Sequence, residues 1–174
     1  GQDTVKEQAF TFIPPPPSIT QVTPGEGPDS GGTTVDVFGD NMDFVEVVTL
    51  GSQELVGPIE IISPTQIRFV TEAHDPGQST LTLTDRFGQA AFFPAAFYFA
   101  APPLIDSLTP LAGTNKGGTP VVITGSGFRS DQNVYFGTVM TAPPTVVGQT
   151  QMFVISPTHP NGDVVIKVVD TWAR

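Results

Sequence analysis

The chain has 174 residues, of which 39% are hydrophobic and 14% charged, so it is expected to fold and could form one large domain or two small ones. Its formal net charge of −10, with only seven Lys and Arg, argues against nucleic acid and anionic membranes as partners, because binding to them depends on neutralising phosphates. The absence of cysteine excludes a disulfide framework, and no apolar run approaches the roughly 18 residues of a membrane span.

The N-terminal residues 1–13 predict an isolated strand. Its apolar part is Ala9, Phe10, Thr11, Phe12 and Ile13. Alternation in a strand would place the two phenylalanine rings on one face and the threonine on the other. Four prolines follow at residues 14–17 and predict a stiff polyproline spacer.

Residues 18–100 predict short β-strands joined by turns. The clearest strand is 80–84, which reads Thr-Leu-Thr-Leu-Thr and places Leu81 and Leu83 on one face. The other strands expected in this region are rich in β-branched and apolar residues and lie at 34–38, 59–62 and 66–70. The region closes with Ala-Phe-Tyr-Phe at 96–99, and no helical period persists anywhere.

Residues 101–103 predict a short linker, and residues 104–174 a second set of strands. These strands are expected at 120–124, 133–136, 151–155 and 164–169. The last of them is more apolar than its counterpart at 80–84, so we expect it to be covered on both faces.

The two regions are copies of one unit. At an offset of 86 positions, Gly31-Gly32-Thr33 aligns with Gly117-Gly118-Thr119. At an offset of 85, three further residues align, namely His74 with His159, Gly77 with Gly162 and Asp85 with Asp170. Offsets that drift by only one position indicate a duplicated domain, and strands alternating with turns at this spacing predict an antiparallel sandwich in each copy.

The second copy carries a recognisable string of residues. It reads Ile105-x-x-Leu108-x-Pro110-x-x-Gly113-x-x-x-Gly117-Gly118-Thr119-x-Val121-x-Ile123-x-Gly125-x-Gly127-Phe128. This string strongly resembles the IPT/TIG domain, and copy one shows it from residue 19 to 39, with Met42 where the motif ends in Phe. The resemblance implies an all-β fold of two tandem immunoglobulin-like sandwiches. The family occurs in bacterial surface proteins, secreted enzymes, receptors and transcription factors, so the likeness does not name a function.

Catalytic machinery is not expected. His74 and His159 stand at equivalent places before a glycine turn, which suits an inherited turn residue better than a catalytic pair divided between two domains. No nucleophile elbow, phosphate loop, dinucleotide fingerprint or zinc spacing is present. We therefore predict that the protein is not an enzyme and has no cofactor.

Two other groups of residues have a functional and a plainer interpretation. Asp40, Asn41 and Asp43 could offer oxygen ligands to Ca²⁺, but the glycine and late glutamate of an EF-hand are missing, which favours a solvated acidic loop. Trp172 could stack on a sugar, but it aligns with Phe87 of copy one, which favours a shared structural role.

The second copy is expected to be incomplete. No Ala-Phe-x-Phe segment follows Asp170, whereas a close match stands at residues 9–12 and is also followed by prolines. Placing residue 1 after residue 174 would bring Phe10 fourteen residues beyond Asp170, against twelve between Asp85 and Phe97 in copy one. We expect residues 9–13 to act as a donor strand for a second domain whose acceptor walls include Val164, Ile166, Val168 and Trp172.

Three functions remain open at this point. The chain could be an extracellular, bacterial structural protein that polymerises head-to-tail by strand donation, with itself as its partner. It could instead be one period of a longer repeat array that forms a surface stalk or adhesin. A third interpretation is an accessory module of a secreted enzyme or receptor that binds carbohydrate or protein.

Overall fold

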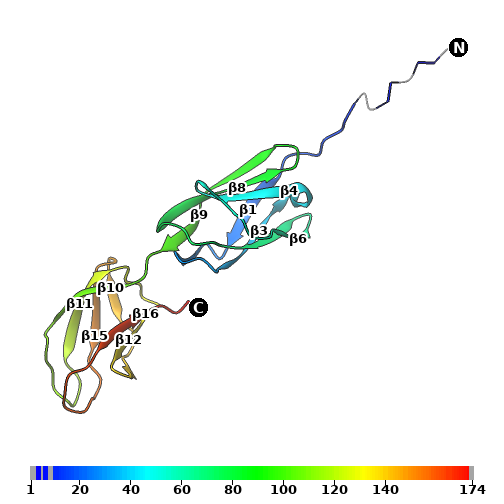
Figure 1. Cartoon of the computed structure of the whole chain (residues 1–174). Helices are drawn as coiled ribbons and strands as arrows, with labels where there is room; N and C mark the ends of the chain where they lie inside the picture. Colours follow the sequence, from blue (N-terminus) through cyan, green and yellow to red (C-terminus); the bar gives the residue numbers. More distant parts are fainter. Residues whose placement is uncertain (1–2, 5, 8–9, 173–174) are drawn as a thin grey trace. The chain divides into compact units, whose positions relative to one another are not determined.

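The computed structural model describes residues 3–4, 6–7 and 10–172, and the chain divides into two compact units, residues 1–99 and 100–174 (Figure 1). Among the described residues all regular structure is β-strand, apart from one 3-10 turn, η1 (Met42–Phe44). None of these residues forms a helix long and apolar enough to cross a membrane. The prediction of an all-β chain is confirmed.

Unit 1 is a sandwich of two antiparallel sheets. The first has the order β1 (Ser18–Thr23), β3 (Thr34–Asp40), β7 (Gln66–Val70) and β6 (Glu60–Ser63). The second has the order β2 (Glu26–Pro28), β9 (Ala90–Ala100), β8 (Gly77–Asp85), β4 (Val45–Leu50) and β5 (Gln53–Glu54). Strand β9 therefore lies between β2 and β8 and is paired along both edges.

The core of unit 1 comes from the inward residues of both sheets. Leu81 and Leu83 of β8 are fully buried, as their alternation with threonine predicts. They pack with Val35 and Val37 of β3. Gly31, with φ of 76°, begins the approach to β3, and a Cβ there would lie 2.5 Å from the carbonyl carbon of Glu72, so only glycine fits this corner.

Unit 2 repeats the sandwich with fewer strands. One sheet has the order β10 (Leu104–Thr109), β11 (Pro120–Ser126), β15 (Gln151–Ile155) and β14 (Thr145–Val147). The other has the order β13 (Val139–Met140), β12 (Asn133–Phe136) and β16 (Ile166–Val169). Its buried core is also smaller and consists of Val121, Ile123, Phe128, Val134, Met152 and Val154.

The last predicted strand of unit 2 differs from expectation. Strand β16 begins at Ile166, two residues later than predicted. Val165 is 65% exposed and Val169 is 42% exposed, so the prediction that this segment is covered on both faces is wrong. Val164, Ile166 and Val168 are half-buried, and the segment therefore alternates as a strand with one solvated face.

The two units differ at one edge. In unit 1, β8 pairs with β4 on one side and with β9 on the other. Its counterpart β16 pairs only with β12 in the part of the chain that the structure describes. Residues 112–114, which align with β2, form no strand there. Within the described residues, β16 of unit 2 is thus unpaired along the edge that corresponds to the β9 edge of β8 in unit 1.

Candidate functional site

The second half of β9 shows what this position holds when it is filled. It runs antiparallel to β8, with Phe97 opposite Ser79, Tyr98 opposite Gln78 and Phe99 opposite Gly77. On its other edge, the backbone N–H of Tyr98 donates to the carbonyl oxygen of Gly25 at 2.9 Å. The strand therefore satisfies backbone groups on both sides.

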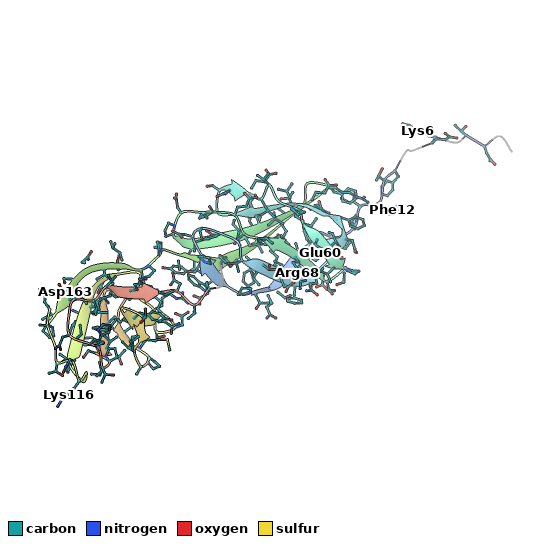
Figure 2. The ribbon with its side chains drawn as sticks, turned by 60° about the horizontal axis from the view of Figure 1, so that its bottom comes forward. Lys6, Phe12, Glu60, Arg68, Lys116 and Asp163 are labelled. Carbon is teal, nitrogen blue, oxygen red and sulfur yellow. The ribbon has the colours of Figure 1, made fainter. Side chains whose placement is uncertain are left out.

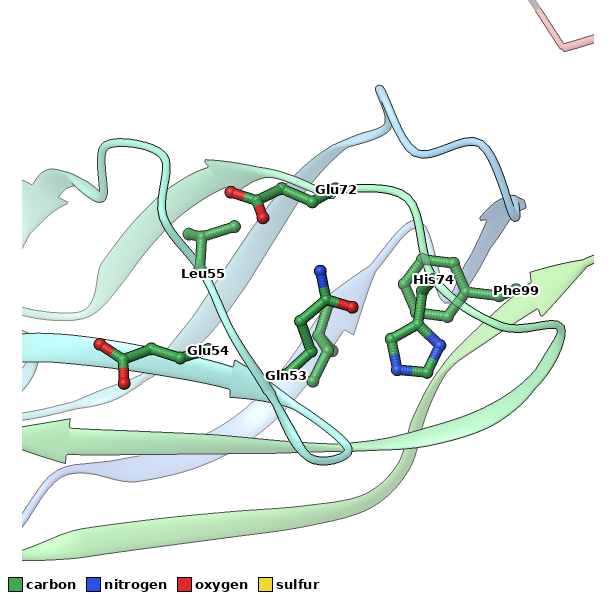
Figure 3. A pocket seen from close by; sticks show the side chains of 7 residues that line it. Gln53, Glu54, Leu55, Glu72, His74 and Phe99 are labelled. Atoms are coloured by element: carbon green, nitrogen blue, oxygen red, sulfur yellow. The ribbon is translucent and has the colours of Figure 1, made fainter.

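Two aromatic side chains anchor this part of β9 in the core. Phe97 and Phe99 are fully buried, with their ring centroids 4.8 Å apart. Phe99 also stacks on His74, at 4.4 Å between centroids and 10° between planes, as Figure 3 shows. A Cβ at Gly27 would lie 2.9 Å from Cζ of Phe97, so the small residue at position 27 makes room for that ring.

A groove of about 410 Å³ occupies the equivalent place in unit 2. Its lining includes Gly113, His159, Gly162 and Val164. These residues align with Gly27, His74, Gly77 and Ser79, which surround Phe97 and Phe99 in unit 1. The groove therefore has the walls of an aromatic-binding slot, and the described residues of unit 2 provide no strand to fill it.

The two histidines hold matching positions in the two units. Nδ1 of His74 lies 2.7 Å from the carbonyl oxygen of Asp75, and Nδ1 of His159 lies 3.0 Å from that of Pro160. The backbone N–H of each also donates to the loop before β3 or β11, to Asp29 at 2.8 Å and to Asn115 at 3.1 Å. Both rings thus have a fixed place, but no local sequence pattern predicts the stacking between His74 and Phe99.

The structure brings together only part of the predicted acceptor set. Val164 and Ile166 line the groove. Val168 is half-buried and packs against the core of unit 2. Trp172 is not part of the groove lining and instead packs against Arg129, whose guanidinium carbon lies 4.4 Å from the ring centroid.

The predicted donor residues are exposed. Phe10 is 75% exposed and Phe12 is 88% exposed, and their rings contact each other with centroids 4.6 Å apart. Figure 2 labels Phe12 in the segment that precedes β1. Thr11 and Ile13 are also exposed, and Ala9 lies outside the described residues.

The proline spacer is fastened to unit 1. The side-chain amide of Asn41 donates to the carbonyl oxygen of Pro16 at 3.0 Å, and that of Gln89 donates to Pro14 at 3.1 Å. Pro17 is buried. Residues 14–17 are therefore held at a defined place on unit 1, directly after the predicted donor residues.

The hydrogen bond from Asn41 to Pro16 involves a residue of the candidate Ca²⁺ loop, which consists of Asp40, Asn41 and Asp43. The Asn41 amide is committed to Pro16, and the backbone N–H of Asp40 donates to Oγ of Ser18 at 3.0 Å. The described residues contain no group of three or more His, Asp or Glu side chains placed to hold a metal ion. In this loop, Asn41 has a φ of 58° and connects the spacer to the sandwich.

Two aspartates of unit 1 are stabilised in their charged form. Asp36 accepts from Nε of Arg68 at 2.8 Å and from Nη2 at 3.1 Å, and these bonds lower its pKa against the opposing effect of partial burial. Arg68 lies opposite Glu60 in the sheet, and Figure 2 labels both. Burial acts to raise the pKa of Asp85, which is only 5% exposed, but hydrogen bonds from Gln89 and from the backbone of Phe87 lower it overall.

We predict that unit 1 loses stability in acid. The folded-state pKa values of Asp36 and Asp85 lie below the ordinary 3.8, so the unfolded chain binds protons more readily than the folded one. Their stabilisation is fully present above about pH 4 and is lost as pH falls through the folded-state values. The urea midpoint of unit 1 should fall below about pH 4. Asp36→Asn should flatten this dependence, and an unchanged pH profile in that variant would contradict the assignment.

Sequence comparison gives the class of the protein. The chain belongs to the IPT/TIG domain family, since the model of that family matches residues 17–99 and again 103–171. The two sandwiches are therefore tandem immunoglobulin-like domains. No curated protein sequence matches the chain.

The chain is also similar to several solved structures. The extracellular region of plexin A4 has 24% sequence identity and a TM-score of 0.50, over 90% of this chain and 17% of the plexin chain. SGBP-B from a complex xyloglucan utilization locus in Bacteroides uniformis has 21% identity and a TM-score of 0.41, over 90% of this chain and 47% of that one. A titin fragment, A168–169, has 12% identity and a TM-score of 0.39, over 88% of this chain and 96% of the fragment. The chain thus spans about a sixth of the plexin chain.

Proposed function

We propose that this protein is a non-enzymatic, extracellular structural protein whose copies assemble head-to-tail. In this assembly, residues 9–13 of one copy add a strand to unit 2 of the next copy. The observation that carries the proposal is that the groove in unit 2 is lined by the counterparts of the residues around Phe97 and Phe99. The sequence Ala-Phe-x-Phe occurs once in β9 and once at residues 9–12.

Burial of the donor aromatics would drive this association. Phe10 and Phe12 are largely exposed in the chain, and burying one phenylalanine side chain contributes about 1.5–3 kcal/mol. The free edge of β16 offers backbone groups to an added strand, which provides main-chain hydrogen bonds while the groove provides specificity. An unpaired strand edge is otherwise prone to aggregation.

The geometry of the contact would determine the kind of assembly. The donor segment and the acceptor groove are different surfaces of one chain, so the contact is heterologous. Repetition of such a contact gives a filament unless a ring closes. The anchored spacer at residues 14–17 would fix the direction in which each donor segment leaves unit 1.

A repeat array is the second candidate, and the same groove supports it. If the chain is one period of a longer polypeptide, the strand beside β16 would be supplied along the same chain. The two candidates share this groove and differ in whether the strand beside β16 comes from another copy or from further along the same polypeptide.

Removal of residues 1–13 tests the proposal. We expect the full chain to form concentration-dependent oligomers in size-exclusion chromatography with light scattering, and the shortened chain to remain a monomer because it lacks the donor aromatics. Far-UV circular dichroism should show that the shortened chain is still folded. The matched control is Phe92→Ala, which removes another exposed phenylalanine from unit 1 and should leave assembly unchanged.

Two results would separate the candidates. Oligomers that persist after residues 1–13 are removed would contradict strand donation. The denatured mass of the protein from its native source distinguishes the array, because separate subunits give about 18.4 kDa and an array gives a much larger value.

A further inference from the structure

We infer a single register for the donor strand, in which Phe10 takes the place of Phe97 and Phe12 takes the place of Phe99. This inference rests on the proposed assembly and specifies its contacts. The pairing of β9 with β8 transfers to unit 2 at the offset of 85. It places the donor antiparallel to β16, with Phe10 opposite Val164, Thr11 opposite Asp163 and Phe12 opposite Gly162.

The floor of the groove fits an aromatic ring at the Phe10 position. Gly27 leaves the space that Phe97 fills in unit 1, and Gly113 stands at the same place in unit 2. Both glycines also lie against a threonine, Thr33 in unit 1 and Thr119 in unit 2. Because the local packing is the same, the ring of Phe10 would lie over Gly113 as Phe97 lies over Gly27.

The wall of the groove fits an aromatic ring at the Phe12 position. A Cβ at Gly51 would lie 3.3 Å from Nε2 of His74, and a Cβ at Gly137 would lie 3.2 Å from Nε2 of His159. Each imidazole is therefore supported by a glycine in the same way. His74 carries Phe99 on its ring, whereas His159 faces the groove, so Phe12 would stack on His159.

Other registers satisfy these contacts less well. A shift by one residue would turn both phenylalanines to solvent and point Thr11 into the groove. A shift by two residues toward Ile166 would leave His159 without an aromatic partner. It would also place Phe10 where the pairing of β8 with β9 is interrupted in unit 1, between Ser79 and Leu81.

The backbone pattern identifies the closest pair of side chains. In unit 1 the N–H of Tyr98 points away from β8, toward Gly25, so Tyr98 and Gln78 form a non-hydrogen-bonded pair. Thr11 and Asp163 inherit this relation, and the N–H of Thr11 would donate to the carbonyl oxygen of Leu111. Facing Cα atoms in such pairs are about 4.5 Å apart, which suits a disulfide.

Disulfide trapping tests the register. The chain contains no cysteine, so single variants Thr11→Cys and Asp163→Cys can be mixed and oxidised without interference. We expect a mixed dimer, identified by mass spectrometry of the linked peptides, to form at least about tenfold faster than with either control, since assembly raises the effective concentration of the pair. One control pairs Thr11→Cys with Val165→Cys, two residues out of register on the same exposed face.

The second control places the cysteine at the equivalent position in unit 1. Gln78→Cys is the counterpart of Asp163→Cys, but its position in unit 1 is already covered by Tyr98 of β9. Trapping with Thr11→Cys at Gln78 as fast as at Asp163 would show random collision and overturn the inference. Faster trapping at Val165 would overturn the register and leave strand donation intact. No trapping at either unit 2 position, with a monomeric full-length chain, would overturn the proposed assembly itself.

Discussion

Replacement of Phe97 by alanine should lower the free energy of unfolding of unit 1 by about 3–5 kcal/mol. Phe97 is fully buried between the sheets, contacts Phe99, and fills the space left by Gly27. The pairing of β9 with both neighbouring strands prevents the backbone from collapsing into the cavity that the substitution leaves. The cost should therefore lie in the range found for large cavities.

Urea unfolding measures this loss, with far-UV circular dichroism for the whole chain and the fluorescence of Trp172 as a separate signal for unit 2. Trp172 is the only tryptophan in the chain. Phe92→Ala is the control, because Phe92 lies in the same strand but is 68% exposed, and its loss should change stability by no more than about 0.5 kcal/mol. If Phe97→Ala cost less than about 1 kcal/mol, the aromatic slot would have little energetic value in either unit.

The sequence predicts the fold well because its signals are local. Alternation at residues 80–84 corresponds to β8, and the repeated glycine pairs at 31–32 and 117–118 are at positive φ in both units. Duplication adds a second, independent copy of each signal. Since the same turns and strands recur at a nearly constant offset, the tandem sandwich could be predicted without knowledge of any contact.

The site could be predicted only in outline, because its contacts join residues far apart in the chain. Alternation placed Val164 and Ile166 on one face, and both line the groove. It could not reveal that His74 stacks on Phe99, a contact between different elements. Nor could it show that Val165 and Val169 face solvent, because an apolar run looks the same whether one face or both are buried.

The attachment of the proline spacer to unit 1 could not be predicted from sequence patterns either. Prolines at 14–17 predict stiffness but not attachment. Attachment comes from the side chains of Asn41 and Gln89, which are distant in sequence from the prolines. Asn41 in particular has a structural use that its neighbourhood of acidic residues did not suggest.

A self-complemented chain should stabilise unit 2 by about 3–6 kcal/mol, the gain expected from burying two phenylalanine side chains. In this chain residues 1–13 are removed from the N-terminus, and a copy of residues 1–17 is joined after residue 174. The added strand can then enter the groove of its own unit 2, beside β16 and His159. Because each groove is filled by its own chain, the product should be a monomer at concentrations where the original chain forms oligomers.

The matched control carries Phe10→Ala and Phe12→Ala in the joined segment only. Both versions have the same length and the same backbone, so a higher urea midpoint of Trp172 fluorescence in the first isolates the contribution of the two rings. Trp172 lies outside the groove and packs on Arg129, so its signal reports the folding of unit 2 rather than contact with the donor. Equal midpoints in the two versions would mean that the rings do not occupy the groove. A stabilised monomer, in contrast, would show that the strand completes unit 2.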